Sequence, residues 1–118
     1  MKLAHVTIMT DCIDQSVEFY EKVVGLTIQR DMRDQPGHAV VFLADAAGDT
    51  CIELGANPHP YQGEGLFLGF AVEDAVAEQT KMRELGLEPG EMIFPNPHAK
   101  FFLIKDPNGV TVQFVQED

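Results

Sequence analysis

The sequence predicts an α+β fold built from two βαβββ modules. Three observations lead to this prediction: apolar and polar residues alternate in several short segments, two segments carry a helical apolar stripe that ends at a glycine, and the whole order occurs twice. With 118 residues the chain is long enough for one domain. We therefore expect a single domain whose modules span residues 1–57 and 65–118, joined by a linker at 58–64 in the Pro- and Gly-rich "ANPHPYQGEG".

Hydrophobic alternation predicts the strands. It is clearest in residues 3–9, 39–43, 51–54, 66–72, 101–104 and 110–115. Two further strands are expected near residues 27–32 and 87–93.

Two helices are predicted from their stripes and end signals. In "SVEFYEKVVGL", Val17, Tyr20 and Val24 share one face, Asp11 or Asp14 is a candidate N-cap, and Gly25 ends the helix. The second helix, "AVAEQTKMRELGL", has its apolar positions at Val76, Met82 and Leu85, with Asp74 as the cap and Gly86 as the stop.

The two halves repeat each other at a nearly constant spacing. Gly25-Leu26 recurs as Gly86-Leu87, Phe42-Leu43 recurs as Phe102-Leu103, and Glu53 matches Gln113. A spacing of this kind indicates duplicated supersecondary units, although any two βαβββ stretches share some likeness.

The charge balance limits the partners. Eight Lys and Arg against 19 Asp and Glu give a net charge of −11, which disfavours nucleic acid and anionic membrane surfaces. The first residues have the composition of neither a signal peptide nor a transmembrane span, so a cytoplasmic protein is expected. Cys12 and Cys51, far apart and outside any CxxC motif, are expected as thiols.

Polar residues gather on one face of three predicted strands. Alternation places His5, Glu53 and Gln113 opposite the apolar faces of "LAHVTIM", "CIEL" and "VTVQFVQ". If these faces line one cavity, an imidazole, a carboxylate and an amide oxygen converge as ligands for Zn, Ni, Mn or Fe. Alternatively, the three side chains face water. Spacing alone favours the second interpretation, because no two of them belong to a local ligand motif.

The layout resembles a known family. "HVTI", "IEL", "FAVED" and above all the closing "KDPNGVTVQFVQ" are similar to segments of the vicinal oxygen chelate superfamily, which includes glyoxalase I, bleomycin-resistance proteins and extradiol dioxygenases. The resemblance spans essentially the whole chain. It implies tandem βαβββ modules that form an open curved mixed sheet around a cavity, commonly in a homodimer.

The resemblance also implies a ligand set. Of the four metal positions in the family, the first falls on His5 and the second on Glu53, both of which match. The third, a histidine in the family, falls on Phe67, and the fourth, usually glutamate, falls on Gln113. Gln113 can donate an amide oxygen to a metal but cannot act as a base, so Glu53 would be the base.

Further residues are expected to contact a substrate. Asn57 matches a family position that holds glutathione, whereas the family's basic positions fall on Met9 and Gly63. His98 and Lys100 lie next to the predicted seventh strand and could reach the cavity mouth, and Phe67 would give it an apolar surface.

Two functions follow from these residues. The first is a glyoxalase-like, metal-assisted lyase or isomerase, related to lactoylglutathione lyase and acting on a small oxygenated metabolite. It would use His5, Glu53 and Gln113 as metal ligands and Glu53 as proton carrier. The second is a metal-free protein that binds a small molecule or antibiotic, as in bleomycin resistance, suggested by Phe67 and Gln113 at ligand positions. An extradiol dioxygenase fits less well, since only His5 of its iron triad is retained.

Overall fold

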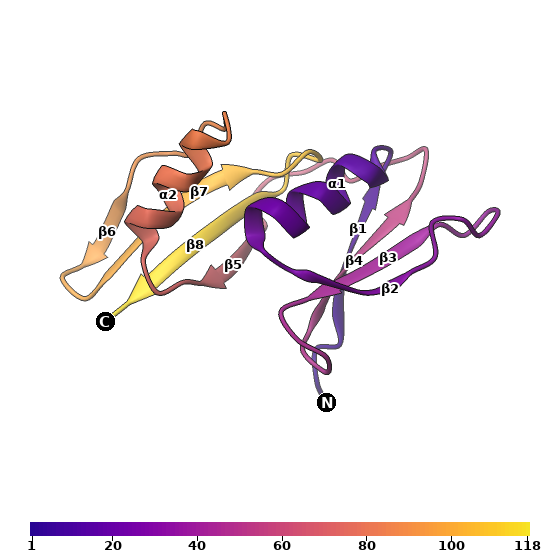
Figure 1. Ribbon diagram of the computed structural model, residues 1–118, viewed down its shortest axis with the longest axis horizontal. Helices are drawn as coiled ribbons and strands as arrows, with labels where there is room; N and C mark the ends of the chain where they lie inside the picture. The colour runs from indigo at the N-terminus through magenta and orange to yellow at the C-terminus, as the bar shows by residue number, and fades with distance from the viewer. The chain divides into compact units, whose positions relative to one another are not determined.

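Two four-stranded mixed sheets, each with its own helix, make up the chain (Figure 1). A computed structural model describes all 118 residues and divides them into two compact modules, residues 1–62 and 63–118. The predicted tandem βαβββ architecture is therefore confirmed. None of the helices is both long and apolar enough to span a membrane.

The first module contains four strands. Its elements are β1 (His5–Thr10), α1 (Ile13–Phe19), the π-helical segment η1 (Tyr20–Val24), β2 (Thr27–Asp31), β3 (Val40–Ala44) and β4 (Cys51–Ala56). The sheet order is β1-β4-β3-β2, with β1 parallel to β4 and the other neighbours antiparallel. Strands that are distant in sequence, β1 and β4, are thus brought side by side.

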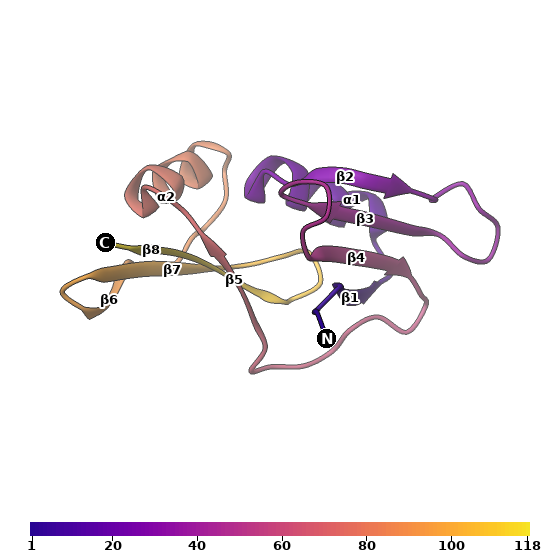
Figure 2. The same ribbon diagram turned by 90° about the horizontal axis from the view of Figure 1, so that it is seen from below.

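The second module repeats this topology. Its elements are β5 (Phe67–Ala71), α2 (Ala75–Glu84), β6 (Ile93–Asn96), β7 (Ala99–Lys105) and β8 (Thr111–Glu117). The sheet order is β5-β8-β7-β6, with β5 parallel to β8. The helix α2 lies over one face of this sheet, against β7 and β8 (Figure 2).

Each sheet has one buried face and one open face. In the first module Ile8, Ile52 and Leu54 are buried, and in the second Phe102, Val112 and Phe114 are buried. Because side chains alternate along a strand, the residues between them point to the other face. This alternation puts His5, Thr7 and Glu53 on one open face, and Gln113 on the other.

The helix ends agree in part with the sequence. Gly25 and Gly86 have φ angles of 87° and 82°, so both helices end at a left-handed glycine as predicted. Asp74 caps α2, since its carboxylate accepts a hydrogen bond from the Ala77 N–H at 3.0 Å. The predicted cap of α1 is wrong. Cys12 occupies that position without a side-chain cap, and Asp14 instead pairs with an arginine.

Two predictions for the second module are wrong. Its second strand, β6, begins only at Ile93, because the segment before it is held by Gly90, which bonds to Leu103 and Gln79. The inward stripe of α2 consists of Ala75, Gln79 and Met82, spaced by four and three residues. Val76 and Leu85, both expected inside, are half exposed.

The internal repeat is shifted by one residue in its third strand. Phe42 is paired with Glu53, whereas Gln113 is paired with Leu103. The two paired residues are 53 − 42 = 11 positions apart in the first module and 113 − 103 = 10 positions apart in the second. Phe42 therefore corresponds to Leu103, not to the buried Phe102.

The "DPNG" turn before β8 is held by one buried carboxylate. Asp106 Oδ1 accepts hydrogen bonds from the Asn108 N–H at 2.7 Å and the Val110 N–H at 2.9 Å. Gly109 follows with a φ of 83°, which favours glycine. The turn thus fixes where β8 begins and, with it, the face on which Gln113 lies.

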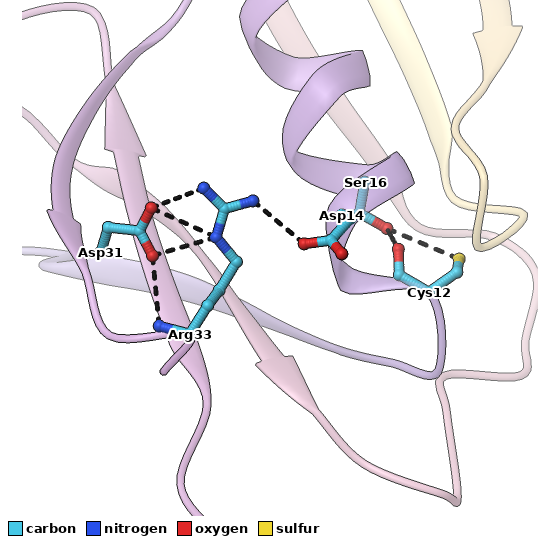
Figure 3. A network of polar contacts seen from close by, with 5 residues as sticks. All are labelled: Cys12, Asp14, Ser16, Asp31 and Arg33. Atoms are coloured by element: carbon cyan, nitrogen blue, oxygen red, sulfur yellow. Dashed lines mark hydrogen bonds and ion pairs between the residues drawn. The ribbon is translucent and has the colours of Figure 1, made fainter. Parts of the chain in front are cut away.

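An arginine joins β2 to the first turn of α1. The Arg33 guanidinium donates to Asp31 at 2.5 Å and to Asp14 at 3.1 Å (Figure 3). No disulfide joins Cys12 to Cys51. The hydrogen bonds from the Arg33 side chain and backbone lower the pKa of Asp31 below its usual 3.8. The same pair raises the pKa of Arg33.

The direction of the Asp31 pKa shift predicts how this contact depends on pH. Because the pKa of Asp31 is lower in the folded state, the contact stabilises the fold above about pH 4 and is lost as the pH falls through the folded pKa. Replacement Arg33→Gln should raise the Asp31 pKa toward 3.8, as measured by an NMR titration of its carboxyl carbon. Lys22→Gln, in an exposed pair with Glu18, is the control. An unchanged Asp31 titration in Arg33→Gln would contradict this assignment.

Candidate functional site

The open face of the first sheet brings together three polar side chains from β1 and β4. The parallel register pairs Thr7 with Glu53 and places His5 two residues earlier on the same face. His5 Nε2 lies 3.6 Å from Glu53 Oε1, and the Thr7 hydroxyl donates a hydrogen bond to the same oxygen. Because Oε1 makes both contacts, Oε2 is the oxygen of Glu53 that faces away from them.

The carboxylate is more enclosed than the imidazole. The side chain of Glu53 is 17% exposed and that of His5 is 45% exposed. The His5 ring meets the edge of Phe42 on β3, with ring centroids 5.9 Å apart. An aromatic ring and a hydroxyl therefore orient a carboxylate and an imidazole that remain open to a small ligand.

The corresponding face of the second sheet is mostly apolar. Gln113 is half-buried and is paired with Gly69 on β5 and Leu103 on β7. A Cβ atom on Gly69 would lie 3.1 Å from Gln113 Oε1, so the glycine leaves room for the amide. Phe67 precedes Gly69 by two residues, as His5 precedes Thr7, and it is 51% exposed. Phe67 is thus a surface residue at the position equivalent to His5.

A shallow cavity of about 490 Å³ lies beside Phe67 within the second module. Leu103, Lys105 and Thr111 also line it, and the Lys105 ammonium donates to the Thr111 hydroxyl at 2.6 Å. Lys105 lies on the same face as Gln113, because it follows Leu103, the partner of Gln113, by two residues on β7. Lys105 therefore provides a cation on the open face.

The other predicted substrate residues lie in different places. Asn57 lines a second cavity of about 330 Å³, next to Asp11 and Ile13, and its side chain accepts a hydrogen bond from the His59 N–H. His98 is exposed in the turn between β6 and β7. Lys100 alternates with Phe101, so it lies on the helix-facing side of the sheet and not on the side of Gln113.

The donors in the first module fit part of a metal site. Two donors bound to one ion at about 2.1 Å lie about 3.0–3.4 Å apart for angles of 90–109°. The separation of 3.6 Å between His5 Nε2 and Glu53 Oε1 is close to this value. No group of three or more His, Cys, Asp or Glu side chains gathers in the chain. Any third protein donor would therefore be of another kind, such as a hydroxyl or an amide.

Thr7 is a site residue that was not among those predicted from the sequence. Its signal is the spacing of two from His5, which puts both on one side of β1. Replacement Thr7→Val removes the hydrogen bond to Glu53 while keeping the shape of the side chain. We expect about tenfold weaker metal binding, the usual cost of losing a partner that orients a ligand.

Titration with Ni²⁺ and Zn²⁺ measures this effect. The control is Thr27→Val, which makes the same change at an exposed position on β2. Equal metal affinity in Thr7→Val and the unmodified protein would contradict a role for Thr7.

The fold and this polar face define a class of small-molecule-binding proteins with paired βαβββ modules. Residues 2–114 match the family model described as the Glyoxalase/Bleomycin resistance protein/Dioxygenase superfamily. The chain belongs to this superfamily, whose members bind small molecules and often depend on a metal.

Relatives with named activities are distant. The chain is 25% identical over 129 residues to a lactoylglutathione lyase of Neisseria meningitidis, covering 99% of this chain and 91% of the relative. Among solved structures it is similar to the antibiotic-binding protein TnmS3 from a Streptomyces species, with a TM-score of 0.82, 19% identity, and coverage of 100% and 97%. Lactoylglutathione lyase from Agrobacterium tumefaciens gives a TM-score of 0.75 at 22% identity, covering 98% of this chain and 92% of that one. These structural similarities support the fold.

Proposed function

We propose that this protein is a glyoxalase-like, metal-assisted lyase or isomerase that acts on a small oxygenated metabolite. The observation that carries the proposal is the contact between His5 and Glu53 on an open sheet face, with Thr7 holding the carboxylate. The distant likeness to a lactoylglutathione lyase over nearly the whole chain supports the same class.

In this proposal His5 and Glu53 would hold a divalent metal, with Gln113 as the further ligand that the family resemblance implies, and the metal would act as a Lewis acid toward the oxygens of the substrate. Glu53 moves the proton. Its Oε2 takes a proton from the carbon that bears the hydroxyl and returns it to the neighbouring carbonyl carbon, while the hydroxyl proton shifts to the former carbonyl oxygen. The result is an isomerisation without an external oxidant. Thr7 keeps the carboxylate pointed at the substrate by donating to Oε1.

The remaining residues are proposed as substrate contacts. Phe67 would supply an apolar surface, and Lys105, which shares the face of Gln113, is better placed than Lys100 for an anionic group. Asn57 and His98 remain predicted substrate contacts. The resemblance to the family further suggests a homodimer, to be measured by light scattering.

A metal-free binding protein is the second candidate. The observation that favours it is the apolar open face of the second sheet, where Phe67 takes the position equivalent to His5. The similarity in fold to an antibiotic-binding protein agrees with this candidate.

An assay of hemithioacetal isomerisation distinguishes the two candidates. Metal-free protein is supplied in turn with Ni²⁺, Zn²⁺, Mn²⁺ and Fe²⁺, and thioester formation is followed from mixtures of 2-oxoaldehydes and thiols. The enzyme proposal expects turnover with at least one metal, lost on chelation and recovered on adding the metal back. If no metal gives turnover and apolar ligands raise the thermal midpoint equally with and without chelator, the binding protein is supported instead.

A further inference from the structure

A row of paired residues crosses the first sheet at the level of Glu53. Thr7 on β1 pairs with Glu53 on β4, Glu53 pairs with Phe42 on β3, and Phe42 pairs with Arg30 on β2. Paired residues on neighbouring strands point to the same face. Arg30 is therefore on the face that carries the candidate site, and the Phe42 side chain lies between it and Glu53 in the row.

A β-bulge puts Arg30 on this face. The register shifts between Ile28 and Arg30, so that Gln29 is the extra residue of β2. In a regular ladder, Ile28 opposite Leu43 would put Gln29 opposite Phe42 and Arg30 opposite the fully buried Val41. The bulge moves Arg30 to the position opposite Phe42, and its guanidinium lies over the Phe42 ring. Bulges that re-aim a side chain are frequent beside functional sites.

The guanidinium is positioned by an aromatic ring. Arg30 Cζ lies 5.7 Å from the centroid of Phe42, and the His5 centroid lies 5.9 Å from the same ring. Phe42 is also the only residue of β3 that is not fully buried. The Phe42 ring thus forms an apolar surface between the His5 imidazole and the Arg30 guanidinium.

Arg30 has no carboxylate partner, in contrast to the arginine three residues later. Arg33 bonds to both Asp31 and Asp14, whereas the polar contact of Arg30 is the Met32 sulfur at 3.5 Å. The guanidinium of Arg30 is exposed and, unlike that of Arg33, is open to an anion from solution. Its fork of N–H donors matches a carboxylate, and the negative field of the whole chain favours a singly charged carboxylate over a doubly charged phosphate.

We propose that Arg30 forms an anion subsite that binds a carboxylate on the substrate, on the far side of Phe42 from His5 and Glu53. The inference rests on the proposed function, because the oxygenated carbon centre of the substrate is taken to lie at His5 and Glu53. It narrows the substrate class to small oxygenated carbonyl compounds that also carry a carboxylate, separated from the reacting carbons by a short apolar spacer.

Two chelating probes of nearly equal shape test this subsite. Butyrohydroxamate is neutral, and the monohydroxamate of succinate replaces its terminal methyl group with a carboxylate. Both are titrated calorimetrically into Ni²⁺-supplied protein, into Arg30→Met, and into Arg83→Met as the control. Arg30→Met keeps an unbranched side chain on Phe42. Arg83→Met makes the same change of charge at an exposed position on α2.

We expect the charged probe to bind about tenfold more tightly than the neutral one in the unmodified protein and in Arg83→Met. The two probes should bind equally in Arg30→Met. In NMR spectra of the unmodified protein, the Arg30 Nε–H resonance should shift with the charged probe only, which gives a result even if Arg30→Met fails to fold.

The other outcomes separate the two proposals. If both probes bind but the preference is absent, or persists in Arg30→Met, the anion subsite is overturned while the metal site stands. If neither probe binds to the Ni²⁺-supplied protein, both the metal site and the subsite are overturned.

Discussion

Replacement of Glu53 by glutamine should reduce metal-dependent turnover by about 10²–10⁴-fold, the usual contribution of a general base. The variant keeps the size and hydrogen-bonding capacity of the side chain but removes its ability to accept a proton at neutral pH. Glu53 is the only carboxylate at the His5 contact, and Gln113 cannot replace it as a base. Steady-state kinetics with the metal that supports turnover measures the effect.

The fold should tolerate this change. An amide at position 53 can still accept the hydrogen bond from Thr7, and it removes a charge from a side chain that is 17% exposed. Circular dichroism and urea unfolding should therefore match the unmodified protein. Glu18→Gln, which alters an exposed glutamate in an ion pair on α1, is the control and should retain full turnover. Turnover that survives in Glu53→Gln would contradict the role of Glu53 as base.

Replacement of Phe102 by alanine should lower the free energy of unfolding by about 3–5 kcal/mol. Its side chain is fully buried between β7 and α2 and stacks on Phe114, with ring centroids 5.2 Å apart. Removing the ring leaves a cavity that neighbouring side chains fill only in part. Urea unfolding, followed by circular dichroism, measures the loss.

The neighbouring residue provides a matched control. Phe101 points to the open face of the same strand, where it is paired with Val115 and is only partly buried. Phe101→Ala should cost about 1 kcal/mol. Equal losses for the two variants would contradict the assignment of faces on β7. The same alternation places Lys105 on the face of Gln113 and Lys100 on the opposite face. Comparing Phe102→Ala with Phe101→Ala therefore also tests which of the two lysines lies on the open face of the second sheet.

Features set by local chemistry were predicted well from the sequence. Alternation identified all the strands except β6, and the open faces that carry His5, Glu53 and Gln113, because the period of two depends on backbone geometry alone. Gly25 and Gly86 were correct as helix ends, since a left-handed residue favours glycine wherever it occurs. Asp74 was correct as a cap for a similar reason.

Features that depend on tertiary contacts were not predicted. Asp14 is used by Arg33 rather than as a helix cap, and that arginine lies 19 residues away. The face on which Arg30 lies was not predicted, because a one-residue bulge decides which way it points. The bond from Thr7 to Glu53, 46 positions apart in the sequence, required knowing that β1 and β4 pair in parallel.

The metal content of the purified protein is the measurement to make first. Protein is incubated with Ni²⁺, Zn²⁺, Mn²⁺ and Fe²⁺, desalted, and analysed for bound elements beside Glu53→Ala and the control Glu18→Ala. A metal centre at His5 and Glu53 predicts close to one ion per chain in the unmodified protein and in Glu18→Ala, and none in Glu53→Ala. No retained metal in the unmodified protein, or equal retention in Glu53→Ala, would contradict it.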